Sequence, residues 1–240
     1  MSALLSVAGV SKRFRGLVAV DRASFEVARG EIFAVIGPNG AGKTTLFSII
    51  AGALKPGEGE IAFQGERIDG LRPDEICRRG IARTFQIVRP FPALTVEDNV
   101  VVGALLRTSD TMQARANAHD VMRRLDLFDK RARAAKSLTL PDRKRLEVAR
   151  ALATAPQLLL LDEVMAGLRP TETDRIVAIL REVNAQGLTI LLIEHVMRAV
   201  MALANRVLVL HHGAPIALGS PAEVVREPAV ISSYLGAEAI

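Results

Sequence analysis

One short segment constrains this chain more than any other. Residues 37–44 read GPNGAGKT and fit the pattern G-x-x-x-x-G-K-[ST]. Residues 31–36 before it alternate like a strand, and residues 44–51 after it have helical spacing. In such a turn the glycines let successive backbone N–H groups point at phosphate oxygens, and the next helix adds the positive end of its dipole. The pattern predicts a phosphate-binding turn in an α/β fold; the alternative is a glycine-rich turn with a surface lysine.

The rest of the chain favours an α/β fold with a helical insertion. Between about residues 95 and 152, helix formers and charged residues dominate, and apolar residues such as Val121, Leu125 and Phe128 fall at helical steps. Strands alternate with helices on either side of this stretch, which indicates a largely parallel sheet. The expected strands are residues 4–10, 23–27, 31–36, 60–63, 158–161, 188–193 and 207–210.

Two carboxylates follow one of these strands. Residues 158–163 read LLLLDE, and four apolar residues in a row predict a strand that is buried on both faces. Carboxylates are costly to bury without partners, and ligands of open α/β sheets bind at the carboxyl ends of the strands. Asp162 is therefore expected to hold Mg²⁺ and Glu163 to orient an attacking water. The alternative is an acidic N-cap for the next helix.

A histidine ends the next strand. Residues 190–195 read ILLIEH, so His195 lies beyond the edge of the sheet to which Asp162 also belongs. A single histidine at a strand end is usually structural. In this position it is also able to reach a γ-phosphate and act as its sensor.

Composition and the distribution of apolar residues argue against a single-stranded nucleic-acid binder, a disulfide-stabilised secreted protein and a membrane-spanning protein. The 240 residues carry a net charge of +5, which is weak support for an anionic partner. Without Trp and with one Tyr, the chain is poorly supplied with aromatic platforms for single-stranded nucleic acid. The single cysteine allows no internal disulfide and fits a reducing compartment. The N-terminus does not read as a secretory signal, and no apolar run approaches the ~18 residues of a membrane span, so at a membrane the protein is expected to sit on the surface.

Taken in order, these motifs resemble those of the nucleotide-binding subunit of ABC transporters, over essentially the whole chain. Residues 37–45 resemble its Walker A motif and residues 158–163 its Walker B motif with the catalytic glutamate. The resemblance implies a P-loop NTPase (RecA-like) core with N-terminal antiparallel strands and an inserted α-helical subdomain. One domain would span residues 1–240, with its core at 1–88 and 156–240 and its helical subdomain at about 89–155.

The resemblance also implies a site for ATP and Mg²⁺. Gln86, within RTFQ, resembles the Q-loop glutamine; His195 resembles the switch histidine; Phe14 resembles the aromatic residue that stacks on adenine. The expected catalytic residues are Lys43, Gln86, Glu163 and His195, and the expected Mg²⁺ ligands are Thr44, Gln86 and Asp162. The expected ATP-binding residues are Phe14, Gly37, Pro38, Asn39, Gly40, Ala41, Gly42, Lys43, Thr44 and Thr45.

A narrower resemblance comes from the segments at 80–100, 165–168 and 230–236, which are similar to branched-chain amino-acid (Liv-type) importers. It implies a peripheral ATPase on the cytoplasmic face of the inner (plasma) membrane. Its partners would be a second ABC ATPase, two membrane permease subunits and, indirectly, a solute-binding protein, with no nucleic acid. Residues 89–92 (RPFP) would lie near the groove for the membrane subunit, or else pack as an ordinary loop.

The signature motif departs from the family. Where the family has LSGGQ directly before a helix, this chain has LTLPD, and of the motif's polar groups only the hydroxyl of Thr139 is kept. Pro141 has no N–H to give, Leu140 adds bulk, and Asp142 would bring negative charge towards phosphate unless it turns away. Thr139 and Asp142 also fit a helix capping box. Val164 and Arg169 replace a proline and a small polar residue in the dimer-interface loop.

These departures lead to a hypothesis of asymmetry. The family motif acts on ATP that is held by the other subunit, so the altered copy would weaken the partner's site and leave this chain's own site the more active in a heterodimer. Other cargoes stay open: urea, amides, aromatic acids or an exported lipid. Two further alternatives are a soluble ABC ATPase that acts on nucleic acid or ribosomes, supported only by the basic charge, and a non-hydrolysing regulatory binder.

Overall fold

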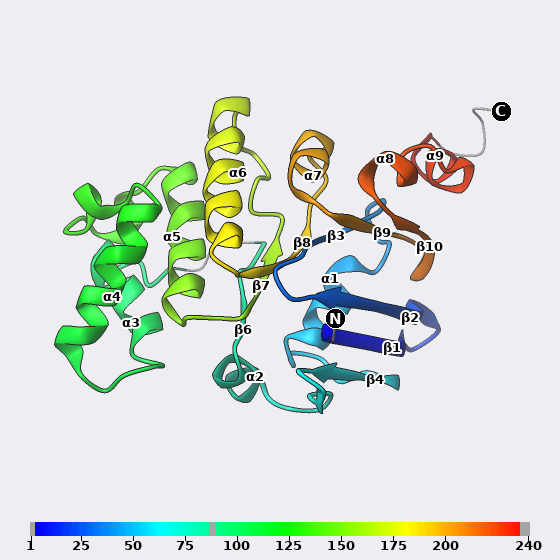
Figure 1. The fold of residues 1–240 in the computed structure, drawn as a ribbon, viewed down its shortest axis with the longest axis horizontal. Helices are drawn as coiled ribbons and strands as arrows, with labels where there is room; N and C mark the ends of the chain where they lie inside the picture. Colours follow the sequence, from blue (N-terminus) through cyan, green and yellow to red (C-terminus); the bar gives the residue numbers. More distant parts are fainter. Residues whose placement is uncertain (1–2, 87–89, 236–240) are drawn as a thin grey trace.

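The computed structural model describes residues 3–86 and 90–235. Within them the chain forms two sheets (Figure 1). An antiparallel sheet has the order β2-β1-β4-β5, and a larger sheet has the order β10-β9-β3-β8-β7-β6, parallel except for β10. The strands are β1 (Ala3–Phe14), β2 (Leu17–Ala28), β3 (Ile32–Ile36), β4 (Glu58–Phe63), β5 (Glu66–Arg67), β6 (Ile81–Arg83), β7 (Leu158–Asp162), β8 (Thr189–Ile193), β9 (Arg206–His211) and β10 (Ala214–Gly219).

Helices cover the larger sheet and form a lobe at one end of it. Helices α3, α4 and α5 gather in this lobe, and α6 and α7 lie beside them over the sheet (Figure 1). The helices are α1 (Lys43–Ile50), α2 (Pro73–Arg79), α3 (Val96–Ala104), α4 (Thr111–Arg124), α5 (Leu140–Ala153), α6 (Pro170–Ala185), α7 (Met197–Leu203), α8 (Pro221–Val224) and α9 (Pro228–Leu235), with short 3-10 turns η1 (Phe128–Lys130) and η2 (Ala135–Ser137).

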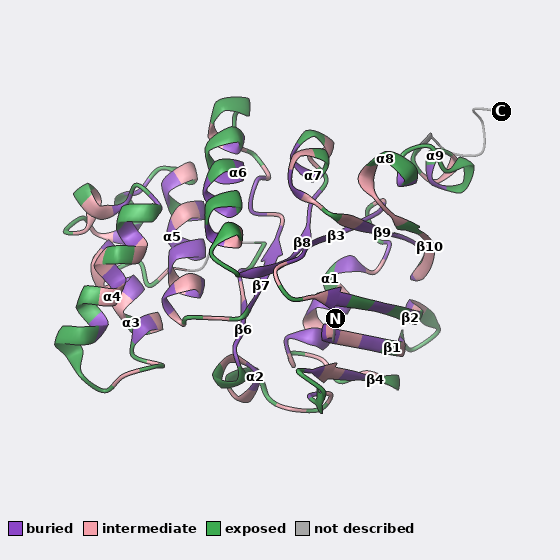
Figure 2. Cartoon of the chain, viewed as in Figure 1, coloured by how far each residue is buried: buried purple, intermediate pink, exposed green. Residues whose placement is uncertain are grey.

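The larger sheet is buried on both faces because helices or strands cover each of them. Successive residues of β3 and β7 point to opposite faces, as strand geometry requires. Phe33 and Leu160 join the core that contains α1 and the antiparallel sheet, whereas Ala34 and Leu161 join the core formed with the helices. The central strands are accordingly buried along their whole length (Figure 2).

The predicted α/β class and the largely parallel sheet are confirmed, and every predicted strand is present with somewhat different ends. The helical steps through Phe128 were wrong in part. Helix α4 ends at Arg124, and Phe128 begins a separate 3-10 turn after Asp126, whose positive φ of 54° breaks the helix. The proposed boundary between residues 88 and 89 lies outside the described residues. None of the described helices is both long and apolar enough to cross a bilayer.

Candidate nucleotide-binding site

The glycine-rich turn joins β3 to α1 and needs its glycines for two physical reasons. Gly37 and Gly42 have φ values of 147° and 99°, in the region that side chains rarely adopt. A Cβ atom at Gly37 would lie 2.1 Å from the carbonyl oxygen of Leu210, and one at Gly42 would lie 2.1 Å from that of Ala19. The turn is therefore packed tightly against β9 and β2, and α1 begins directly after Gly42.

Lys43 is buried at the start of α1. Its ammonium donates to the carbonyl oxygens of Gly37 at 2.7 Å and Pro38 at 3.0 Å. Burial lowers the pKa of Lys43, and the charges of Glu163 and Asp162 oppose this shift. The lysine thus lies inside the turn, with the two carboxylates close enough to act on it electrostatically.

Asp162 ends β7 and is 1% exposed. Its Oδ2 accepts a hydrogen bond from Arg83 at 2.8 Å, and Oδ1 is buried with no hydrogen-bond partner. Burial raises the pKa of Asp162, although Arg83 acts in the opposite direction. A buried carboxylate oxygen that lacks a partner costs free energy, and a hard divalent cation is the kind of group that would satisfy it. The residues present therefore fit Mg²⁺, with Asp162 and the exposed hydroxyl residue Thr44 as oxygen donors.

Glu163 lies beside side chains from two other segments. Gln86 Nε2 donates to Glu163 Oε2 at 2.8 Å, and His195 Nδ1 lies 3.9 Å from the same oxygen. The backbone of Glu163 has a φ of 50°, which is uncommon for a residue with a side chain. The three residues that the sequence predicts as catalytic partners of Lys43 are therefore brought together at one edge of the sheet.

A pocket of about 640 Å³ opens beside this edge, within the size range of small-molecule sites. The turn residues 39–45 line it together with Phe14, Gln86, Glu163 and His212. Phe14 ends β1 and is 43% exposed, with Lys12 Nζ 5.6 Å above its ring. The aromatic ring and the phosphate turn thus belong to the same pocket.

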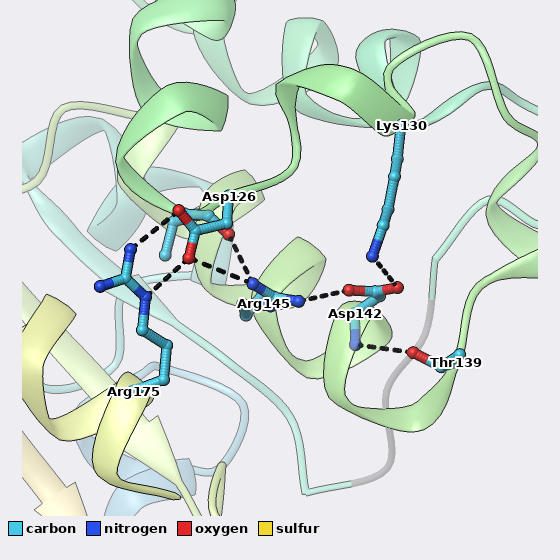
Figure 3. Close-up of polar contacts among 7 residues, drawn as sticks. Asp126, Lys130, Thr139, Asp142, Arg145 and Arg175 are labelled. Atoms are coloured by element: carbon cyan, nitrogen blue, oxygen red, sulfur yellow. Dashed lines mark hydrogen bonds and ion pairs between the residues drawn. The ribbon is translucent and has the colours of Figure 1, made fainter. Parts of the chain in front are cut away.

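The altered signature residues form the start of α5. Thr139 is the N-cap and accepts a long hydrogen bond of 3.5 Å from the N–H of Asp142, so the first half of the predicted capping box is confirmed. The second half is wrong, because the carboxylate of Asp142 turns to Lys130 at 2.6 Å and to Arg145 (Figure 3). Pro141 lies in the first turn, where a missing N–H is tolerated, and Leu140 is 47% exposed.

Asp142 is the inner end of a chain of charged groups. Arg145 also reaches Asp126 at 3.4 Å, and Arg175 on α6 holds Asp126 with two hydrogen bonds of 2.7 and 2.8 Å (Figure 3). Burial would raise the pKa of Asp142, but the hydrogen bond from Lys130 and the charge of Arg145 hold it below its ordinary value. The network joins the helical lobe to α6 of the sheet layer.

The sequence did not single out Arg83, which contacts both the carboxylate of Asp162 and the hydroxyl of Ser48. A charged residue at the end of an apolar strand was the available signal, since β6 pairs with β7 in parallel. Of the expected docking segment, Arg89 lies outside the described residues. Phe91 is 44% exposed, and the guanidinium carbon of Arg150 lies 4.9 Å from the centre of its ring.

A parallel sheet with a glycine-rich phosphate turn, a buried lysine and two carboxylates at its carboxyl edge defines a P-loop nucleoside triphosphatase. Comparison with known families narrows this class. Residues 20–166 match the ABC transporter family, and residues 214–240 match the family described as branched-chain amino acid ATP-binding cassette transporter. The chain belongs to the ABC transporter family and is an ATPase of that family.

Individual relatives agree with this assignment. The chain is 41% identical to the high-affinity branched-chain amino acid transport ATP-binding protein LivG of Escherichia coli, over 97% of this chain and 98% of the relative. It is 36% identical to BraF of Pseudomonas aeruginosa, over 97% and 98%, and 34% identical to the lipopolysaccharide export system ATP-binding protein LptB of Acidithiobacillus ferridurans, over 98% of each. A nucleotide-free ATP-binding cassette from an ABC transporter superposes with a TM-score of 0.89 at 30% identity, over 98% of this chain and 100% of that one.

Proposed function

We propose that this chain binds MgATP in the pocket beside the glycine-rich turn and hydrolyses it to drive solute import. Phe14 stacks on adenine, and the backbone N–H groups of the turn hold the phosphates. Lys43 leaves the carbonyl oxygens of Gly37 and Pro38 for the β and γ phosphates. Bound Mg²⁺ would neutralise developing charge on the phosphate oxygens, with Thr44, Gln86 and Asp162 as its protein ligands.

In the hydrolytic step the oxygen of a water attacks the γ-phosphorus as the bond to the ADP oxygen breaks. Glu163 accepts a hydrogen bond from that water and fixes its direction, while Gln86 and His195 position the carboxylate and the γ-phosphate. The observation that carries this proposal is the convergence of Gln86, Glu163 and His195 beside Asp162, whose Oδ1 is buried without a partner.

The cargo and partners rest on the relatives. Because LivG and BraF are named for branched-chain amino acid transport, we infer that the cargo is a branched-chain or related amino acid. The partners are a second ABC ATPase, two membrane permease subunits and a solute-binding protein, and the chain works at the cytoplasmic face of the inner membrane. The similarity to LptB favours one competing cargo, an exported lipid. Uptake of labelled leucine by cells that lack this chain, with and without its gene restored, distinguishes the two: unchanged uptake contradicts the amino-acid cargo.

Replacing the carboxylate of Glu163 tests the hydrolytic role. Glu163→Gln keeps the size of the side chain and removes the group that orients water, so turnover by the assembled transporter is expected to fall by about a hundredfold or more, while MgATP still binds. Phosphate release and binding of a fluorescent ATP analogue measure the two effects. If the variant keeps the parent's turnover, the proposed role of Glu163 in orienting the attacking water is wrong.

The altered signature supports a heterodimer in which the two ATP sites differ. In the first turn of α5, Asp142 and Arg143 donate their N–H groups to Thr139 and Pro141 has none, which leaves few donors for a phosphate. Leu140 presents an exposed apolar side chain at the same end. We infer that ATP held by the partner meets a weak clamp on this chain, whereas ATP held here depends on the partner's signature.

A further inference from the structure

A buried lysine beyond the expected motifs links α5 to the catalytic edge of the sheet. Lys144 is 5% exposed, although a buried ammonium is costly unless hydrogen bonds and opposite charges satisfy it. Its Nζ donates to the backbone carbonyl of Glu163 at 3.0 Å and, at 3.5 Å, to that of Gln86. Burial lowers the pKa of Lys144, and the charges of Glu194 and Glu163 oppose the shift.

The carbonyl that Lys144 holds belongs to a residue in a sparsely populated conformation. Glu163 has a φ of 50°, and such a backbone persists only where its surroundings fix it. Its N–H donates to the carbonyl of Ile193 on β8 at 3.0 Å, and its carbonyl also accepts from the N–H of Ala166 at 3.2 Å. These three groups therefore contact the backbone of Glu163, and Lys144 is the one that comes from α5.

A second buried ionisable side chain contributes to the arrangement. Glu194 is 1% exposed, and its Oε1 accepts the N–H of Met165 at 2.9 Å, two residues after Glu163. The residue that follows Glu194 is His195, whose Nδ1 lies 3.9 Å from the Glu163 carboxylate. The loop that begins at Glu163 is thus held from one side by Lys144 of α5 and from the other by Glu194 of the histidine segment.

We propose that Lys144 is a positioning residue for ATP hydrolysis: by holding the carbonyl of Glu163, it fixes the direction of the catalytic carboxylate and couples it to the position of α5. This inference rests on the proposed role of Glu163. Lys144 lies two residues beyond Asp142 on the same helix, so a displacement of the signature end of α5 moves the ammonium that holds the catalytic loop. The lysine contacts the backbone of Glu163 and need not touch the nucleotide.

Lys144→Met removes the ammonium and keeps an unbranched side chain of similar length. A transporter assembled with this variant is expected to have a kcat that is lower by about tenfold or more, because a small misplacement of a catalytic group slows the reaction. Its affinity for MgATP is expected to stay unchanged. Lys144→Arg keeps a cationic donor and should restore most of the turnover. Lys136→Met, an exposed lysine of the same lobe, is the matched control and should behave as the parent.

Two measurements keep the outcomes separate. Glu163→Gln in the same assay tests the proposed function, since turnover that survives it overturns the role of Glu163 itself. If Glu163→Gln is inactive but Lys144→Met keeps the parent's kcat, or loses MgATP binding in step with kcat, the positioning role is overturned. Hydrogen exchange of the amides of Ala166 and Leu168 reports the loop directly; it should accelerate in Lys144→Met and not in Lys136→Met, and equal exchange in both contradicts the inference.

Discussion

At the scale of single residues, sterics rather than charge set the phosphate turn. Gly42→Ala places a methyl group 2.1 Å from the carbonyl oxygen of Ala19 at a φ of 99°, so either the turn or β2 must shift. The variant is expected to lose MgATP affinity by about tenfold or more, because the turn's N–H groups no longer converge. Titration with a fluorescent ATP analogue measures the loss.

Gly16→Ala is the matched control, since a Cβ there meets nothing within 4 Å. It should bind as the parent does and change the free energy of unfolding by no more than about 1 kcal/mol. Equal affinities for the parent and Gly42→Ala would show that the turn does not need this glycine.

Some residues of the candidate site could be predicted from the sequence and others could not. The glycines, Lys43, Asp162 and Glu163 were predicted because each lies in a short segment whose spacing carries its chemistry. Arg83 and Lys144 were not, because their partners lie 79 and 19 residues away and no local window joins them. A charge at the end of an apolar strand, for Arg83, and a charge on the inner side of a helix, for Lys144, were the available local signals.

At the scale of elements, tertiary contacts override the capping box that the sequence predicts at the start of α5. Thr139 caps the helix as its sequence predicts, yet the carboxylate of Asp142 does not close the capping box. Lys130 and Arg145 hold it instead, and two cations outweigh a single backbone N–H as partners of a buried carboxylate. The helical steps through Phe128 extended the expected helix past the end of α4, because apolar spacing continues beyond Asp126, where the backbone turns.

Asp142→Asn tests this assignment through pH. The folded pKa of Asp142 is lowered, so its contribution is present above the ordinary value of about 3.9 and is lost as the pH falls through the folded value. At pH 7 the variant is expected to be less stable by about 2 kcal/mol, because it leaves two cations without their carboxylate. Urea denaturation of both proteins at decreasing pH should show this gap closing below about pH 4.

Asp120→Asn is the matched control, because Asp120 pairs with Arg123 on the exposed surface of α4. Its effect at pH 7 should be no more than about 0.5 kcal/mol, as is usual for exposed pairs. A gap for Asp142→Asn that is equally small, or that does not change with pH, would contradict the network.

At the scale of the whole molecule, the alternation of strands and helices predicted the largely parallel sheet, and the texture of residues 95–152 predicted a helical insertion. The attachment of the lobe to the sheet layer could not be predicted. It includes the ion pairs of Asp126 with Arg145 and Arg175, three residues from separate segments that meet only in the folded chain. The charged chain from Asp142 to α6 therefore ties the signature end of α5 to the body that carries the ATP site (Figure 3).

The heterodimer hypothesis leads to a test in which only the partner's ATP site can respond. When this chain carries Glu163→Gln, the ATP site on this chain does not hydrolyse ATP. Any turnover by the assembled transporter then comes from the ATP site on the partner ATPase. Adding Leu140→Gly and Pro141→Gly restores the small residues and one N–H at the start of α5, and phosphate release should rise by about tenfold. Since Asp142 already faces Lys130 and Arg145, the further change Asp142→Gln should add little and should lower the thermal midpoint. If neither combination raises turnover, residues 138–142 act as a helix cap alone, and a homodimer with two equal sites becomes the simpler arrangement.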